Sequence, residues 1–138
     1  MSKSFNLKLI TPEEIVYDGE AIEVILPTKM GEIGVLAGHE RLVTILDQGE
    51  IRVKTASGEL SLASLGGFAE INPESVKILS DSAVRSEKID ALAAEEAKKK
   101  AEQLLLQAKD DIEMAEASAA LEKALLHIKI SQRKKRHH

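Results

Sequence analysis

Side chains that could carry out chemistry are few and scattered in this chain. Glu32, His39 and Glu40 lie close together and are of types that bind metals or transfer protons. His127 lies far along the sequence, and no nucleophile or second nearby histidine completes a site. The simplest interpretation of these residues is a set of polar side chains near a turn. We therefore predict no catalytic site, no metal site and no bound cofactor.

Known catalytic and nucleotide-binding motifs are also absent from the sequence. There is no glycine-rich phosphate loop and no dinucleotide-binding glycine pattern. Ser61 and Ser64 have no histidine at a spacing that indicates a catalytic triad. The absence of cysteine excludes disulfides and fits a reducing compartment. No window approaches the roughly 18 apolar residues that a membrane-spanning helix needs, and no signal peptide is visible. We expect membrane association to be indirect.

The composition changes abruptly at residues 81–86. Before this point, short runs of Val, Ile and Leu alternate with Gly, Pro and Asn. From residue 89 to residue 132 there is no Gly or Pro, and Ala, Leu, Glu and Lys dominate. The first composition is typical of strands and the second of helices. We predict a β domain over residues 1–85 and a helical extension over residues 86–138.

Alternating apolar and polar residues mark the strands of the first part. Phe5, Leu7 and Leu9 alternate with polar or outward residues, as in a half-buried strand. We interpret Asp18-Gly19 as a turn, Pro27 as the end of a strand, and Gly66-Gly67 as a bulge or corner. The fold class is therefore α+β, with an antiparallel β-sandwich of about nine to ten short strands. Strands are expected near residues 5–10, 15–17, 21–26, 33–36, 42–46, 49–54, 59–65, 68–71 and 76–79.

Helical spacing governs the second part. Asp90 is the expected N-cap of the first helix, and Ser86 is the alternative. Residues 109–111 interrupt an apolar stripe, which predicts two antiparallel helices of about 18 to 20 residues joined by a short turn. The stripe comprises Ala101, Leu104, Leu105, Ala108, Met114, Ala117, Leu121, Ala124, Leu125 and Ile128.

The facing surfaces of the two helices are small. A buried Ala contributes on the order of 0.8 kcal/mol, against roughly 1.5–3 kcal/mol for Leu. Helices that are stable alone but adhere weakly suit an element that detaches and relocates. The alternative is an ordinary hairpin that stays docked on the sandwich. The expected contact pairs Ala93, Ala94, Ala97 and Ala101 with Ala115, Ala117, Ala120 and Ala124.

Charge is distributed unevenly along the chain. Residues 1–84 carry 7 basic and 13 acidic side chains, whereas residues 85–138 carry 12 and 10. No acidic residue follows Glu122, although the end of the chain is rich in Lys and Arg. A basic end favours an acidic surface, and the alternative is a solvated terminus. Nucleic-acid binding is disfavoured because no aromatic residue interleaves the basic ones.

One stretch of the sequence identifies a family. Residues 26–39, LPTKMGEIGVLAGH, resemble the signature of the epsilon subunit of F-type ATP synthases. The resemblance continues through residues 65–71, LGGFAEI, residues 76–79, VKIL, and Ile89-Asp90. It covers nearly the whole chain in order, including the division into a sandwich and a helical hairpin.

This resemblance implies a non-catalytic subunit of the rotor's central stalk. The sandwich would bind the gamma subunit and sit on the ring of membrane c subunits, at the cytoplasmic face of a bacterial membrane. Gly31, Glu32 and Ile33 would reach the polar loops of that ring, and His39 would be a further partner contact. The hairpin would rise along gamma and block ATP hydrolysis in the catalytic alpha/beta head. Its expected contact residues are Lys123, Lys129, Arg133 and Lys134.

The chain departs from the family pattern in two places. Glu40-Arg41 replaces the Ala-Pro that often follows the Gly-His pair. Some relatives bind ATP through a motif whose arginine position is Ala93 here. Lysine reproduces the bidentate phosphate contact of arginine poorly, so we expect no ATP sensing. Asp90, Lys100 and Lys123 would be the remnants of such a site.

A second interpretation belongs to another functional class. The chain could be a stand-alone β-sandwich interaction module that dimerises through its helical arm. The apolar stripe over residues 101–128 would then pair between chains and not within one.

Overall fold

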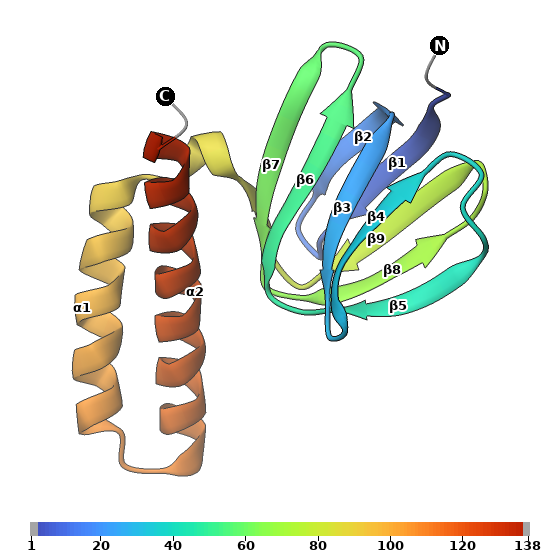
Figure 1. Ribbon diagram of the computed structural model, residues 1–138. Coiled ribbons are helices and arrows are strands. Elements are labelled where there is room, and N and C mark those ends of the chain that lie inside the picture. The colour runs from blue at the N-terminus through green and yellow to red at the C-terminus, as the bar shows by residue number, and fades with distance from the viewer. Residues whose placement is uncertain (1–2, 137–138) are drawn as a thin grey trace. The chain divides into compact units, whose positions relative to one another are not determined.

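The structure, a computed structural model, describes residues 3–136, and it describes side chains as far as residue 133. Two compact units meet between residues 87 and 88, two residues beyond the expected boundary. The first unit consists of strands and the second of two helices (Figure 1). We describe each unit by itself.

From residue 3 onward, the described part of the first unit contains ten strands, and a short 3₁₀ turn, Ser86–Lys88, follows them. In one layer β4, β3, β6, β7 and β10 lie side by side, and in the other β5, β8, β9, β1 and β2 do. Thr28 of β3 pairs with Leu46 of β5 and joins the two layers. The predicted sandwich is confirmed, although β1 and β9 run parallel. The strands are β1 Phe5–Ile10, β2 Ile15–Ala21, β3 Glu23–Thr28, β4 Gly31–Leu36, β5 Leu42–Leu46, β6 Gly49–Thr55, β7 Gly58–Ser64, β8 Gly67–Ile71, β9 Ser75–Ser80 and β10 Ala83–Arg85.

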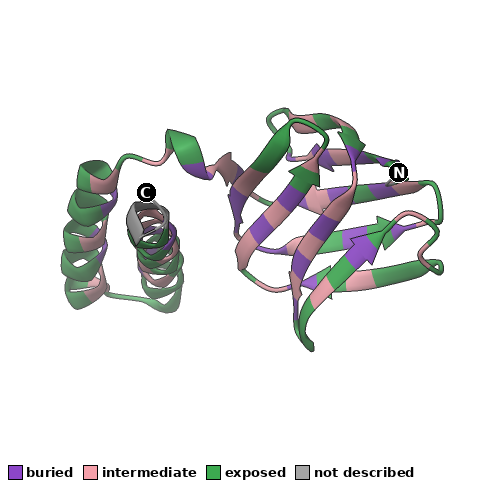
Figure 2. Ribbon diagram, turned by 45° about the horizontal axis from the view of Figure 1, so that its top comes forward, coloured by how far each residue is buried: buried purple, intermediate pink, exposed green. Residues whose placement is uncertain are grey.

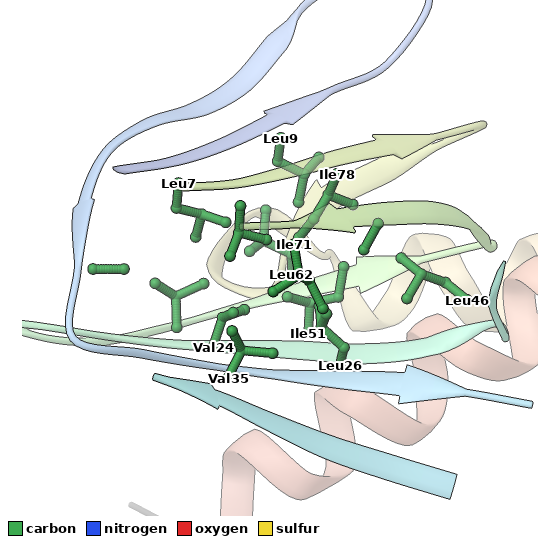
Figure 3. Packing of buried hydrophobic residues seen from close by; sticks show 14 of the residues in the cluster. Leu7, Leu9, Val24, Leu26, Val35, Leu46, Ile51, Leu62, Ile71 and Ile78 are labelled. Atoms are coloured by element: carbon green, nitrogen blue, oxygen red, sulfur yellow. The ribbon is translucent and has the colours of Figure 1, made fainter. Parts of the chain in front are cut away.

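Alternate residues of the strands fill the space between the layers. Along β1, for example, Phe5, Leu7 and Leu9 are buried, as their alternation predicts. Figure 3 shows branched aliphatic side chains, Leu7 and Leu9 among them, meeting from both layers. Figure 2 shows the alternation of buried and exposed positions along the strands. The buried cluster contains Phe5, Leu7, Leu9, Ala21, Val24, Leu26, Val35, Leu46, Ile51, Val53, Leu62, Ala69, Ile71, Val76, Ile78 and Ala83.

Strand pairing overrides two local turn signals. Asp18-Gly19 is not a turn, because both residues lie within β2 opposite Lys8 and Leu7 of β1. Pro27 does not end its strand: β3 continues to Thr28, and the Pro27 carbonyl accepts a hydrogen bond from the Asp47 N–H at 2.9 Å. A proline weakens a strand ladder because it lacks an N–H donor, but its carbonyl oxygen can still accept a hydrogen bond, as it does here. The three-residue β10 was not expected from the sequence.

The predicted corner at Gly66-Gly67 is present. Both glycines have positive φ, +106° and +139°. A Cβ on Gly67 would collide with the Leu79 carbonyl oxygen and lie 2.8 Å from the Ser80 Cα. This corner therefore requires glycine for both its backbone conformation and its close approach to β9.

The second unit is a hairpin of α1 (Ala91–Gln107) and α2 (Asp111–Arg136). The Asp90 carboxylate accepts from the Leu92 and Ala93 N–H groups, so Asp90 and not Ser86 is the N-cap. At the turn, Asp110 caps the Glu113 N–H, and the Glu113 carboxylate accepts from the Lys109 N–H in return. Among residues 3–136 no helix is long and apolar enough to cross a membrane.

Half of the alanines expected in the helix contact are elsewhere. Ala94 and Ala101 of α1 and Ala117 and Ala124 of α2 are buried at seven-residue spacing. The exposed members of the expected set are Ala93, Ala97, Ala115 and Ala120. We call the contact between the two helices the seam. It buries Ala94, Ala101, Ala117 and Ala124 and partly buries Leu105 and Leu121, so it uses a different helix face from the one that the exposed alanines occupy.

Candidate partner-binding surfaces

The turn between β3 and β4 presents an apolar tip. Thr28 Oγ1 accepts from the Met30 N–H at 3.1 Å and donates to the Gly31 carbonyl at 2.6 Å. Gly31 has φ +112°, which favours glycine. The Met30 side chain is 95% exposed as a result. Lys29 beside it contacts Asp47 at 3.4 Å.

Glu32 is the second residue of the return strand β4 and is paired with a cation. Its Oε1 accepts from the Arg52 Nη2 of β6 at 3.0 Å. Of the two glycines that flank Glu32 and Ile33, only Gly31 directly follows the turn and has a positive φ. Gly34 lies within β4 opposite Ile25 and has no positive φ.

His39 is not in the same place as Glu32. It follows the other end of β4, whose six residues separate the two ends by about 17 Å. Gly38 donates its N–H to the Pro73 carbonyl at 2.7 Å, and His39 Nδ1 lies 2.7 Å from the Glu40 carbonyl oxygen. Of the predicted contact residues, Gly31 and Glu32 are exposed beside the turn, whereas Ile33 is partly buried and packs against the core cluster. His39 belongs to a different surface.

An apolar row that was not predicted from the sequence lies on the outer face of the second layer. Ile45 of β5 pairs with Phe68 of β8, and Phe68 pairs with Leu79 of β9. Leu79 pairs with Ile10 of β1, which in turn pairs with Ile15 of β2. Directly paired residues share a face of the sheet. Ile45 is 64% exposed, Phe68 46% and Ile15 55%. We call these five residues the apolar row.

A charged row runs beside the apolar row on the same face. Glu70 of β8 pairs with Lys77 of β9, Lys77 with Lys8 of β1, and Lys8 with Asp18 of β2. Val43 of β5, 69% exposed, pairs with Glu70 and extends the apolar surface. The face is therefore half apolar and half polar, the anatomy of a protein–protein contact.

The C-terminal end of α2 is rich in basic residues. α2 has 26 residues and α1 has 17, so α2 extends past the start of α1 by about two and a half turns. We call residues 128–136 the overhang. Lys129 and Arg133 are exposed there and share a face at four-residue spacing. Lys123 precedes the overhang and points to another face, and the side chain of Lys134 is outside the described part.

The expected remnants of an ATP site, Asp90, Lys100 and Lys123, are all exposed in the hairpin. The Asp90 carboxylate is engaged in capping α1.

Burial, and next the charge of Lys123, lower the pKa of His127 below its usual 6.5. A groove of about 450 Å³ lies at the hairpin turn, lined by Leu104, Gln107, Lys109, Glu113, Glu116 and Ala117. No group of three metal-binding side chains occurs among the described residues.

Comparison with protein families accounts for both units. Residues 4–86 match the beta-sandwich domain of the ATP synthase delta/epsilon chain, and residues 87–132 match its long alpha-helix domain. The chain belongs to the ATP synthase epsilon chain family. Members of this family are non-catalytic subunits of the ATP synthase complex, which agrees with the prediction from sequence.

Curated epsilon chains match over most of their length. The ATP synthase epsilon chain of Thioalkalivibrio sulfidiphilus is 34% identical over 99% of both chains. That of Neisseria meningitidis is 40% identical over 89% of both. Epsilon chain 2 of Ralstonia nicotianae is 40% identical over 93% of both.

Solved structures of ATP synthases contain similar chains. One is a chain of the Euglena gracilis mitochondrial ATP synthase in a structure of OSCP, F1 and c-ring. It has a TM-score of 0.72 and 30% identity, and the match covers 86% of this chain and 76% of that one. A chain of the Tetrahymena thermophila central stalk and c-ring has a TM-score of 0.64 over 94% and 98%, and at 13% identity it supports the fold alone.

Proposed function

We propose that this epsilon chain is a rotor subunit of the central stalk that couples the catalytic head to the membrane ring. The carrying observation is the match of both units, in order, to epsilon chains over 99% of both lengths. It would be a peripheral component at the cytoplasmic face of a bacterial membrane, in an enzyme that translocates protons or sodium ions.

The apolar row is the proposed docking surface for the gamma subunit. Fully burying one Ile or Phe contributes about 1.5–3 kcal/mol, so the exposed Ile45, Phe68 and Ile15 supply much of the affinity of a stable contact. The adjacent charged row would fix the orientation of the partner. The half-apolar character of this face, with Val43 at its edge, supports this assignment.

The β3–β4 turn is the proposed contact with the polar loops of the membrane ring. Met30 and Glu32 protrude at the end of the hairpin formed by these strands, and both are exposed. This surface is separate from the apolar row, so one sandwich can hold a stalk partner on its face and a ring partner at its end.

The overhang is the proposed inhibitory element. The sequence has no acidic residue after Glu122, so the overhang contains only basic charges of its own, and α1 does not extend alongside it. In a partly desolvated cavity each opposite-charge pair can contribute about 1 kcal/mol or more, whereas exposed pairs give little. Contact with acidic segments of the catalytic head would therefore inhibit ATP hydrolysis.

Docking of gamma can be tested with paired aspartate substitutions. Ile45→Asp with Phe68→Asp should abolish co-purification with gamma, because two charges would be buried in the contact. Leu36→Asp is the matched control, since Leu36 is 56% exposed on the other layer. Equal binding by both variants would contradict the docking surface. A gamma-independent dimer in sedimentation would instead favour the dimerising module, although Ala101, Ala117 and Ala124 of the predicted stripe are already buried within the chain.

Inhibition can be tested by charge reversal. Lys129→Glu with Arg133→Glu, extended to Lys123 and residues 134–136, should release ATP hydrolysis of reconstituted head complexes and leave assembly intact. Lys99→Glu with Lys109→Glu controls for charge elsewhere on the hairpin. Inhibition that is absent in the wild type, or that is indifferent to charge reversal and to salt, would contradict this role.

A further inference from the structure

Arg52 and Glu32 meet across an intervening strand. Arg52 of β6 pairs with Ile25 of β3, and Glu32 of β4 pairs with Pro27 of the same strand. The guanidinium therefore passes over β3 to reach the carboxylate at 3.0 Å. The two residues are 20 apart in sequence, and no spacing rule for helices or neighbouring strands connects them.

The pair occupies one carboxylate oxygen and leaves the other available. Among the described residues Glu32 makes one side-chain hydrogen bond, through Oε1. Its side chain remains 56% exposed, against 33% for Arg52. The Arg52 Nε–H is buried and makes no hydrogen bond to a described residue. The directional contact of this guanidinium is thus the one that holds Glu32.

We propose that Arg52 is a positioning residue that holds the Glu32 carboxylate, within an ion pair of no net charge, as an oriented hydrogen-bond acceptor for the membrane ring. This inference rests on the proposed contact between the β3–β4 turn and the ring. Because the ion pair has no net charge, its long-range field is weak, and the remaining Oε2 accepts a short-range hydrogen bond from an N–H or O–H group of a polar loop. The contact is therefore insensitive to salt.

Removing Arg52 changes the nature of the contact. Glu32 then carries an unpaired charge on a side chain free to adopt several rotamers. A free carboxylate attracts cationic groups at low ionic strength, and this attraction is screened at high ionic strength. The number of ions pumped per ATP then depends on salt. Loss of a residue with a purely structural role would not produce this salt dependence.

The test uses assembled ATP synthase in inverted membrane vesicles. Ion pumping per ATP hydrolysed is measured from about 50 to about 500 mM KCl, a range over which the screening length falls severalfold. The variants are Arg52→Met, Arg52→Lys and Glu32→Ala. Lys29→Met is the matched control, because it breaks an exposed ion pair at the same turn. Thermal unfolding of each full-length subunit monitors folding.

The expected ratio is flat with salt for the wild type and for Lys29→Met. For Arg52→Met the ratio falls by about twofold or more as salt rises. For Arg52→Lys the ratio falls less, because lysine keeps a positive charge beside Glu32. If Arg52→Met fails to fold, the comparison is made between Arg52→Lys and the wild type. Glu32→Ala lowers the ratio at every salt concentration. The positioning role is overturned if the pumping ratio of Arg52→Met is as independent of salt as that of the wild type while Glu32→Ala is uncoupled. Normal coupling in the Glu32→Ala enzyme would contradict the proposed contact between the β3–β4 turn and the ring.

Discussion

The sandwich and the hairpin bury apolar surface in different ways. Every one of the largest fully buried side chains, among them Leu62, Ile71 and Ile78, lies in the sandwich. Among the described side chains of the hairpin, through residue 133, the buried hydrophobic ones are four alanines and Ile130. Four buried methyl groups contribute only about 3 kcal/mol, to which the half-buried Leu105 and Leu121 add.

This difference separates a fixed scaffold from an element that can open at low cost. The sandwich gains many times more from its core, so its docking surfaces stay in place. The helices of the hairpin instead derive stability from good helix formers and from caps at Asp90 and Asp110. Each helix can therefore persist when the seam between them is lost.

The largest effect is expected in the core of the sandwich. Leu62→Ala should destabilise the sandwich by about 2–5 kcal/mol, because Leu62 is fully buried and leaves a cavity. Leu36→Ala, on an exposed leucine, should cost less than about 0.5 kcal/mol. Hydrogen exchange resolved by peptide should show the loss in residues 3–85 and not in the hairpin. A loss of protection shared by both units would contradict their independence.

A smaller effect is expected in the seam. Ala101→Gly should destabilise the hairpin by about 1–2 kcal/mol, of which about 1 kcal/mol is helix propensity and the rest the lost methyl contact. Ala97→Gly is the matched control, since Ala97 is exposed on the same helix and should lose the propensity term alone. Urea unfolding followed by far-ultraviolet circular dichroism measures the difference. Equal losses would mean that the seam contributes nothing.

Prediction from sequence was most successful where the signal is local. Alternation located most strands, and Asp90 was recognised as an N-cap because a cap acts within three residues. The turn at Asp18-Gly19 and the stop at Pro27 were wrong because pairing with β1 and β4 outweighs local propensity. The face that each alanine presents could not be fixed, since Ala93 and Ala94 are equally apolar.

Surface sites were harder to predict than the fold. Alternation implied that outward residues are polar, so Ile45, Phe68 and Ile15 were not recognised as a row. That row exists only after five strands are placed in register. The Glu32–Arg52 pair has the same origin, because a third strand separates its members. The exposed apolar residues at outward positions were the available signal.

A pH effect smaller than the seam substitution should appear in the hairpin alone. Burial, followed by the charge of Lys123, lowers the pKa of His127 in the folded state below 6.5. The unfolded chain then binds the proton more readily, so hairpin stability should be greatest above pH 6.5 and decline as the pH falls below it. His127→Gln should remove this dependence, whereas His39→Gln in the sandwich should not. A pH profile unchanged by His127→Gln would assign the dependence to another group.

The smallest expected effect is that of removing the hairpin on the stability of the sandwich. The buried cluster of the first unit is drawn from residues 5–83, and every strand lies before Ser86. A stop after Ser86 should therefore leave a soluble β domain that binds gamma and unfolds within about 0.5 kcal/mol of the sandwich in the full chain. The assay is urea unfolding followed by hydrogen exchange of core amides, with gamma co-purification as the functional check. Leu62→Ala in the truncated chain should cost the same as in the full chain, because distant and independent sites add. If the truncated chain aggregates, or if Leu62→Ala becomes markedly more costly within it, the hairpin is part of the scaffold and the contrast between a fixed and a detachable unit fails.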